Sequence, residues 1–218
     1  TERLLMPLML KKMSDNSRID REYISIIEAG GAHAFKFKEM LEFIGVPTLI
    51  ITDIDSGNPE TNRSKCRTDL DGAITTNSTL NRLFTRMFIN ENPPAKNEKC
   101  KDNLTVKYLQ ELAAEKKVFK NIRVAYQIPE NEKYPAGRSF EEAFIKANLP
   151  IIITEKNNFE SNIKSKIKNI NNQEKLAEDS YEISNSIDKT DFAFDILMLE
   201  DWNIPNYIKE GLEWLNQQ

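Results

Sequence analysis

The segment VPTLIITDIDSG, residues 46–57, constrains the fold more than any other part of the chain. Residues 46–52 are apolar, β-branched or proline and carry no charge, which is typical of a strand buried on both faces of a parallel sheet. Pro47 lies near the start of this run, where a strand tolerates proline. Asp53 and Asp55 follow, so we expect them at the carboxyl edge of the sheet, where open α/β sheets bind ligands.

The two aspartates indicate a site for a divalent metal ion. Side chains at positions i and i+2 of a strand project to the same side, so the carboxylates of Asp53 and Asp55 would repel each other without a cation between them. Carboxylate oxygens are hard ligands of the type that Mg²⁺ and Mn²⁺ prefer. The alternative is an Asp-rich turn that only ends the strand, and an isolated Asp-x-Asp sequence does not distinguish the two.

The composition indicates a globular protein and excludes several classes. The 218 residues suffice for one sizeable domain, and no segment has the length of a membrane span or the pattern of a signal peptide. Cys66 and Cys100 lie far apart in polar surroundings, and His33 is the only histidine. This excludes a disulfide framework and a Cys/His zinc site and makes the cytoplasm the expected location. The net charge of −4 argues against a protein that coats DNA, but a nuclease with acidic residues at its metals remains compatible.

The rest of the sequence predicts helices and strands in alternation around this strand. Ahead of it we expect a helix at 2–13, a short strand at 23–27 and a helix at 32–44 that ends at Gly45, which together make an α-β-α-β unit. The later elements expected are helices at 80–89, 104–117, 138–144, 191–199 and 207–215, a strand at 122–128, and a surface helix or loop at 156–175. Ser139 and Glu142 have the spacing of a capping box at the start of the 138–144 helix.

Residues 24–55, ISIIEAGGAHAFKFKEMLEFIGVPTLIITDID, resemble the core of a Toprim domain. The similarity is greatest to the nuclease domain of the OLD (overcoming lysogenization defect) family of ATP-dependent endonucleases, which includes nucleases of the Gabija type. Four more matches follow in the order of the family: TTNSTL at 75–80, RSFEEAF at 138–144, KTDFAF at 189–194 and PNYIKEGL at 205–212. The resemblance implies an α/β Toprim fold over 1–218, with a mostly parallel sheet, helices on both faces and a helical insertion at about 57–120.

The same resemblance implies a metal-dependent DNA endonuclease that uses two Mg²⁺ or Mn²⁺ ions, with anti-phage defence as its biology. The metal ligands that it implies are Asp53, Asp55, Glu2 and Glu141. Arg138 would position Glu141 or contact a phosphate, and Lys189 would stabilise charge in the transition state. Each residue also has an ordinary structural interpretation: the acids can start helices, and Lys189 can be a surface lysine.

The chain departs from the family pattern at its start. The family's first strand ends in an E-G-x-x-E type motif, and TERLL at residues 1–5 matches only the end of it. We therefore expect the first strand with its glutamate, and an ATPase domain, upstream of residue 1. No G-x-x-x-x-G-K-[ST] sequence occurs here, so ATP would act only through that domain. Other expected partners are DNA, a second copy of the chain and a helicase-like protein. The rival functions are a Toprim-like scaffold that binds DNA or a partner without cleaving, and a topoisomerase or primase.

Overall fold

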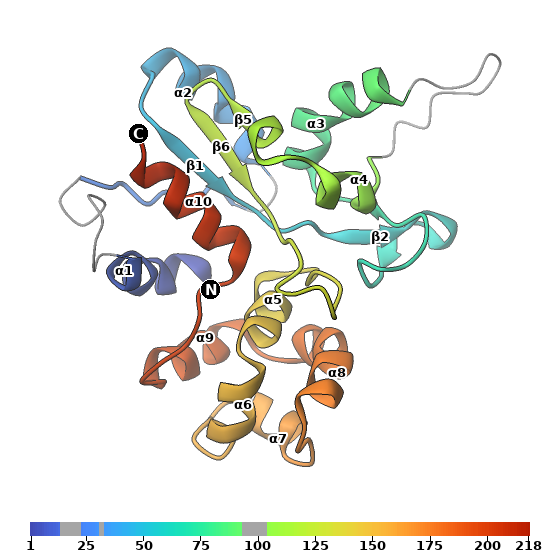
Figure 1. Ribbon diagram of the computed structural model, residues 1–218, viewed down its shortest axis with the longest axis vertical. Coiled ribbons are helices and arrows are strands. Elements are labelled where there is room, and N and C mark those ends of the chain that lie inside the picture. The colour runs from blue at the N-terminus through green and yellow to red at the C-terminus, as the bar shows by residue number, and fades with distance from the viewer. Residues whose placement is uncertain (14–22, 31–32, 93–103) are drawn as a thin grey trace.

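The main sheet of the protein is small and mixed. The structure, a computed structural model, describes residues 1–13, 23–30, 33–92 and 104–218 (Figure 1). Its strands β1 (Thr48–Ile51), β6 (Ile122–Ala125) and β5 (Val118–Phe119) lie in the order β1-β6-β5. β1 and β6 are parallel, whereas β5 returns antiparallel to β6. The expected α/β class is confirmed, although the strand expected at 122–128 ends three residues earlier.

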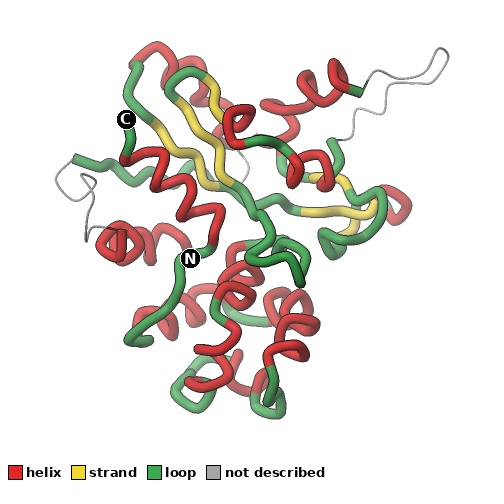
Figure 2. Tube along the Cα trace, viewed as in Figure 1, coloured by secondary structure: helices red, strands yellow, loops and turns green. Residues whose placement is uncertain are grey.

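Helices cover both faces of this sheet (Figure 2). Ile50 and Val124 on one face pack with the buried side chains of α3 (Ser78–Glu91) and α4 (Val106–Glu111). Leu49 and Ala125 on the other face belong to a second apolar cluster that includes α10 (Asn206–Asn216). α10 lies so close to the sheet that a Cβ atom on Gly211 would be 2.8 Å from Cδ1 of Leu49. The expectation of helices on both faces is therefore correct.

A helical layer lies below the carboxyl end of β1 in Figure 1. Its elements are α1 (Glu2–Met13), α5 (Phe140–Ala147), α6 (Leu149–Glu155), α7 (Ile163–Ile167), α8 (Gln173–Ser186) and α9 (Lys189–Met198). The buried ring of Phe144 holds the layer together, because its centroid is 5.8 Å from that of Phe192 and 5.5 Å from that of Trp202. None of the described helices is long and apolar enough to cross a membrane.

Two of the expected elements differ from the structure in the N-terminal part. Residues 23–27 form no strand, because none of the described strands pairs with them and the side chains of Tyr23 and Ile27 are 94% and 80% exposed. A strand needs a hydrogen-bonded neighbour, and a β-branched sequence does not supply one. The helix expected at 32–44 is a 3₁₀ turn, η3 (Ala34–Phe37), followed by α2 (Lys38–Ile44), and it ends as predicted at Gly45 with φ of 76°. Residue 32 itself lies outside the described residues, as does Cys100.

The segment at 57–120 contains more than helices. Three short strands, β2 (Ser56–Asn58), β3 (Ser64–Lys65) and β4 (Ile74–Thr75), form a second, antiparallel sheet in the order β3-β2-β4, and η4 (Pro59–Thr61) lies between the first two. The helix expected at 104–117 is divided into α4 and η5 (Ala114–Lys117), because Leu112 between them has an extended backbone. That this segment is an insertion stays a prediction.

The start of α5 corrects the expected capping box. Ser139 holds the N-cap position, but its side chain makes no capping hydrogen bond. Glu142 instead accepts a hydrogen bond from the backbone N–H of Arg138 at 2.7 Å, one residue before the expected partner. Its other carboxylate oxygen lies 2.6 Å from Nζ of Lys146, and the two side chains are only 3% and 2% exposed. Glu142 is therefore half of a buried ion pair and not only a helix cap.

The buried pair makes a stability prediction for Glu142→Gln. Glutamine can still accept the Arg138 N–H, but the ammonium group of Lys146 loses its counter-charge inside the protein. Loss of one partner of a buried pair commonly costs about 3–5 kcal/mol. We expect a loss of this order in the free energy of unfolding, measured in urea.

Glu141→Gln is the matched control, since the partner of Glu141 is the half-exposed Lys189 and the loss should be much smaller. In the double variant Glu142→Gln/Lys146→Met, where no charge stays buried, part of the stability should return. Equal losses in Glu141→Gln and Glu142→Gln would contradict the assignment.

Candidate metal centre

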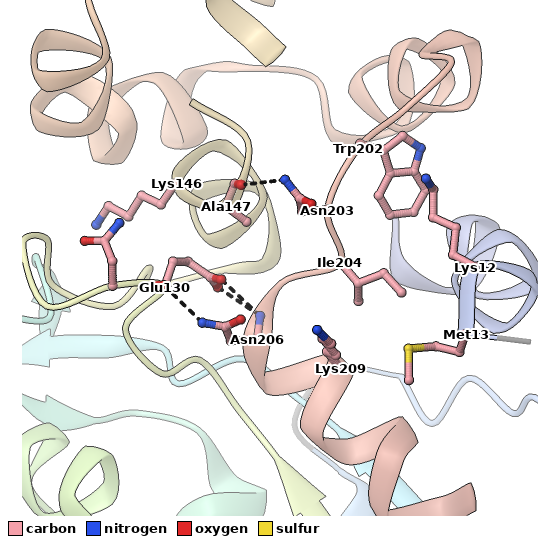
Figure 3. A pocket seen from close by; sticks show the side chains of 11 residues that line it. Lys12, Met13, Glu130, Lys146, Ala147, Trp202, Asn203, Ile204, Asn206 and Lys209 are labelled. Carbon is pink, nitrogen blue, oxygen red and sulfur yellow. Dashed lines mark hydrogen bonds between the residues drawn. The ribbon is translucent and has the colours of Figure 1, made fainter. Parts of the chain in front are cut away.

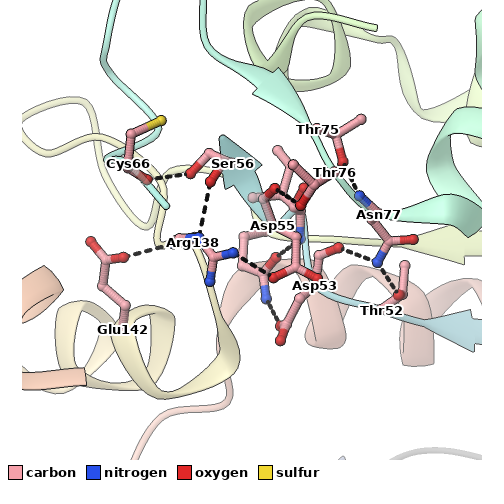
Figure 4. A network of polar contacts seen from close by, with 12 residues as sticks. Thr52, Asp53, Asp55, Ser56, Cys66, Thr75, Thr76, Asn77, Arg138 and Glu142 are labelled. Atoms are coloured by element: carbon pink, nitrogen blue, oxygen red, sulfur yellow. Dashed lines mark hydrogen bonds and ion pairs between the residues drawn. The ribbon is translucent and has the colours of Figure 1, made fainter. Parts of the chain in front are cut away.

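Asp53 and Asp55 lie at the carboxyl end of β1, where the sequence predicts them (Figure 4). The backbone turns sharply there, since Asp55 has a φ of 51°. Two residues of the loop before α3 hold the turn. Asn77 donates to the carbonyl of Asp53 at 2.7 Å, and the N–H and hydroxyl of Thr76 both donate to the carbonyl of Asp55 at 2.9 Å. The two carboxylates are thus presented by a fixed backbone.

The carboxylate of Asp53 joins β1 to helix α5. Its Oδ1 accepts hydrogen bonds from the backbone N–H of Phe140 at 3.0 Å and from Nε2 of Gln127 at 2.5 Å. The residue keeps some contact with solvent, yet burial of the carboxylate is the main reason that the pKa of Asp53 is raised to about 8. The negative charges of Glu2, Asp55 and Glu141 raise it further. All three other acids expected as ligands therefore act on Asp53.

Arg138 binds the other aspartate of the pair. Its Nη2 is 2.9 Å from Oδ1 of Asp55, and its Nε donates to the carbonyl of Ser56 at 3.0 Å. The carbonyl of Arg138 also accepts from the backbone N–H of Asp55 at 3.3 Å. The guanidinium is only 11% exposed. These contacts fix the turn at residues 55–56 against the start of α5. Arg138 therefore positions Asp55, whereas the resemblance implied that it positions Glu141.

Glu141 and Lys189 form a second ion pair at the site. Oε2 of Glu141 lies 2.9 Å from Nζ of Lys189, and Oε1 of Glu141 accepts from the hydroxyl of Thr1 at 3.0 Å. Lys189 is the first residue of α9, and Asp188 caps that helix by accepting from two backbone N–H groups. Partial burial disfavours the charged lysine, but attraction to Glu141 outweighs it, and the pKa of Lys189 lies above its ordinary value. The lysine is cationic, with 57% of its side chain exposed.

Glu2 reaches the same site from the first turn of α1, as its effect on the pKa of Asp53 indicates. Glu28, the acid that follows the segment 23–27, does not. It forms an ion pair with Arg3 at 3.3 Å in which both side chains are 66% exposed. Glu28 is also absent from the charges that raise the pKa of Asp53. Thus the structure gathers all six predicted site residues and leaves Glu28 aside.

The carboxylate oxygens of the four acids are suitable ligands for a divalent cation, although in this structure they do not surround a single position. Within the described residues, no three acidic, cysteine or histidine side chains are arranged to hold one ion. Arg138 and Lys189 instead pair with Asp55 and Glu141. Burial of Asp53, and then repulsion by the charges of Glu2, Asp55 and Glu141, raises the pKa of this carboxylate. A cation near Asp53 would relieve that repulsion, and the oxygen-only chemistry of the set fits Mg²⁺ or Mn²⁺.

Gln127 is the residue of this site that the sequence analysis missed. It follows β6 by two positions, its side chain is buried, and it contacts Asp53, Ile54 and Tyr207. The signal in the sequence was a single amide in the apolar run IRVAYQI, which is weak because such a glutamine can also face solvent at the end of a strand. Asn77 also caps α3, since its side chain accepts hydrogen bonds from the N–H groups of Thr79 and Leu80.

A separate pocket of about 520 Å³ opens on another side of the helical layer (Figure 3). The C-terminal parts of α1 and α5 and the segment before α10 line it. Its polar residues include Lys12, Glu130, Asn203 and Lys209, and none of the six site residues lies in its wall. Burial raises the pKa of Glu130 to about 7, and both its oxygens accept the N–H of Asn206 at the start of α10. Glu130 thus has a structural role as a helix cap.

The fold and the acidic end of β1 fit a Toprim domain, and the N-terminal part of the chain matches the OLD-like class of that domain. Residues 1–55 match the family described as "Overcoming lysogenization defect protein-like, TOPRIM domain". Among individual proteins, the chain is 33% identical over 222 residues to "Endonuclease GajA" of Bacillus cereus (strain HuB5-5). The alignment covers 93% of this chain and 28% of that protein, so the chain spans little more than a quarter of its relative's length. No solved structure matches significantly.

The raised pKa of Asp53 predicts how stability depends on pH in the absence of divalent ions. An aspartate in the unfolded chain loses its proton near pH 4, whereas Asp53 in the folded protein keeps it until about pH 8. Between these values the folded state binds more protons than the unfolded state, so the free energy of unfolding should fall as the pH rises and level off above pH 8. Urea unfolding in EDTA at several pH values measures this slope.

Asp53→Asn should flatten the slope, because asparagine keeps an acceptor for Gln127 and Phe140 but has no charge. Glu130→Gln is the control: Glu130 contributes a slope of the same sign that ends near pH 7, so this variant leaves the change between pH 7 and pH 8 in place. An Asp53→Asn protein with the slope of the unaltered protein would show that Asp53 ionises normally.

Proposed function

We propose that this chain is the nuclease domain of a metal-dependent DNA endonuclease of the OLD family. The observation that carries the proposal is the convergence of Glu2, Asp53, Asp55 and Glu141 at one end of β1, together with two cations. The relationship to a protein named an endonuclease supports it. The expected ions are Mg²⁺ or Mn²⁺, and two of them bound about 3.5–4 Å apart would activate water and support the leaving oxygen of a phosphodiester.

The site residues would have separate roles in metal binding, in positioning and in stabilising charge. The four acids would hold the ions, with Asp53 as the ligand at the centre. Arg138 keeps the turn of Asp55 against α5. Lys189 is cationic and more than half exposed, so its ammonium group can reach a bound phosphate and stabilise the charge that develops on it. Binding of an ion at Glu141 would free Lys189 from its present partner for that task.

The tyrosine at the site does not favour a topoisomerase function over a nuclease function. A topoisomerase with a Toprim domain would need a tyrosine nucleophile, which a separate domain supplies. Within this chain, Tyr207 contacts the site, but it is 2% exposed and its hydroxyl accepts a hydrogen bond from Gln127. Burial raises its pKa well above the ordinary value, so the reactive phenolate is disfavoured. A non-cleaving scaffold stays the rival, and it predicts metal binding without hydrolysis.

The proposal extends to the complete protein. The relative is much longer than this chain, which leaves room for the expected ATPase domain in a protein of that type. ATP would act through that domain. A second copy, a helicase-like partner, the cytoplasmic location and anti-phage defence all stay predictions from the family resemblance.

Cleavage of supercoiled plasmid with Mg²⁺ or Mn²⁺ tests the proposal. Asp53→Asn should abolish cleavage, because the amide removes the central anionic ligand while the hydrogen bonds of Oδ1 that hold α5 can remain. Circular dichroism should show an intact fold. Asp179→Asn is the control, since Asp179 pairs with Lys175 on α8 and neither is among the charges that act on Asp53. Full cleavage by Asp53→Asn would remove the basis for the function.

Lys189→Ala should lower turnover far more than DNA affinity, by on the order of 10²–10³, because its charge is needed where charge develops in the reaction. Lys133 is a close control: its side chain is 60% exposed, against 57% for Lys189, and it pairs with Glu174 at 2.6 Å. Lys133→Ala should leave turnover unchanged. If Lys189→Ala instead weakened binding with a shallower salt dependence and normal turnover, Lys189 would be an ordinary phosphate contact.

A further inference from the structure

The side chain of Gln127 is fully buried beside the acids, and every polar group on it is used. Its Oε1 accepts from the backbone N–H of Ile54 at 2.6 Å. Its Nε2 donates to Oδ1 of Asp53 at 2.5 Å and to the hydroxyl of Tyr207 at 3.3 Å. A buried amide is costly unless it is hydrogen-bonded, so a glutamine with all its partners in place is well fixed.

The orientation of this amide follows from its partners. The N–H of Ile54 can only donate, so it must face the carbonyl oxygen of Gln127 and not the NH₂ group. That places Nε2 on the side of Asp53 and Tyr207. One side chain therefore holds both the backbone after Asp53 and the carboxylate of Asp53 itself.

We infer that Gln127 is a positioning residue that makes Asp53 bind metal through its Oδ2 atom. Gln127 and the N–H of Phe140 both bind Oδ1, and no donor among the described residues reaches Oδ2. Oδ2 is thus the oxygen left for an ion. The inference rests on the proposed metal-dependent function and adds to it a residue and a division of roles between the two oxygens.

A neutral donor is suited to this role. An amide orients a carboxylate without cancelling its charge, whereas a lysine or arginine at the same place would compete with the metal ion. The two cations of the site lie elsewhere, on Asp55 and Glu141. Partners in the outer shell of metal ligands commonly change metal affinity by about 10–100-fold when they are removed.

The test compares Gln127→Met with Asn148→Leu in Mn²⁺ titrations followed by thermal unfolding, without DNA. Methionine has a similar length but cannot donate to Asp53. Asn148 is also a fully buried amide with all its groups bonded, to Phe144 and Asn203, but it does not touch the site. We expect Gln127→Met to raise the Mn²⁺ concentration for half-maximal stabilisation by about 10-fold or more. Asn148→Leu should lower the melting temperature in EDTA and leave that concentration unchanged.

Two further variants keep the inference testable if Gln127→Met does not fold. Gln127→Asn keeps an amide that is one methylene shorter, so it should also weaken Mn²⁺ binding. Tyr207→Phe removes only the hydroxyl from the same amide and should have little effect on Mn²⁺ binding, since the bond to Asp53 stays.

Unchanged Mn²⁺ affinity in either Gln127 variant overturns the inference while the proposed function stands. An unaltered protein that shows no response to Mn²⁺ overturns the proposed function and the inference together. Plasmid cleavage by Gln127→Met should recover in large part at high Mn²⁺, because the ligand itself is still present; no recovery despite bound Mn²⁺ would assign Gln127 a role other than positioning.

Discussion

The hydrogen bonds to Oδ1 of Asp53 connect the parts of the protein on which the candidate site depends. Through this one atom, the end of β1 is bound both to the segment after β6 and to the first N–H of α5. Glu141 directly follows Phe140, and Arg138 lies two residues before Phe140. The hydrogen bond between Phe140 and Asp53 therefore helps to position both Glu141 and Arg138. If the contact were lost, the contacts of Arg138 with Asp55 and Ser56 would still join the two segments, but the carboxylate of Asp53 would no longer be fixed to α5.

The charges around Asp53 are unbalanced in a way that fits the proposed ligand. Four carboxylates face two cations, so with every group ionised two negative charges remain (4 − 2). Helices α1 and α5 place Glu2 and Glu141 in their first turns, where the helix dipole favours an acid. The dipole is unfavourable for Lys189 at the start of α9, and its ion pair with Glu141 offsets that cost. Divalent cations bound at the site would offset this negative charge.

The sequence predicts those features that depend on strong local patterns. The uncharged run before Asp53 defines β1, and the motifs around Glu141 and Lys189 locate the site by resemblance to the family. The sequence does not predict pairing between short segments, since β2, β3 and β4 have two or three residues each and no periodicity. It also does not reveal burial: the spacing of Glu142 and Lys146 is visible, but their enclosure follows from tertiary packing, as does the inward turn of Gln127. Residues 23–27 show the opposite error, a strand-like sequence without a partner strand in the described part of the chain.

The order of the site residues along the chain determines when the site can form during translation. The acids occur early and in the middle, whereas Lys189 and Tyr207 belong to the last two helices. Ribosomes add roughly 5–20 residues per second, and the early part of a chain can fold while the rest is still being made. A nascent chain that already carries Asp53 and Glu141 still lacks the cation of α9 and the α10 helix that covers the sheet. The proposed site can therefore be assembled only after α9 and α10 have been added to the growing chain.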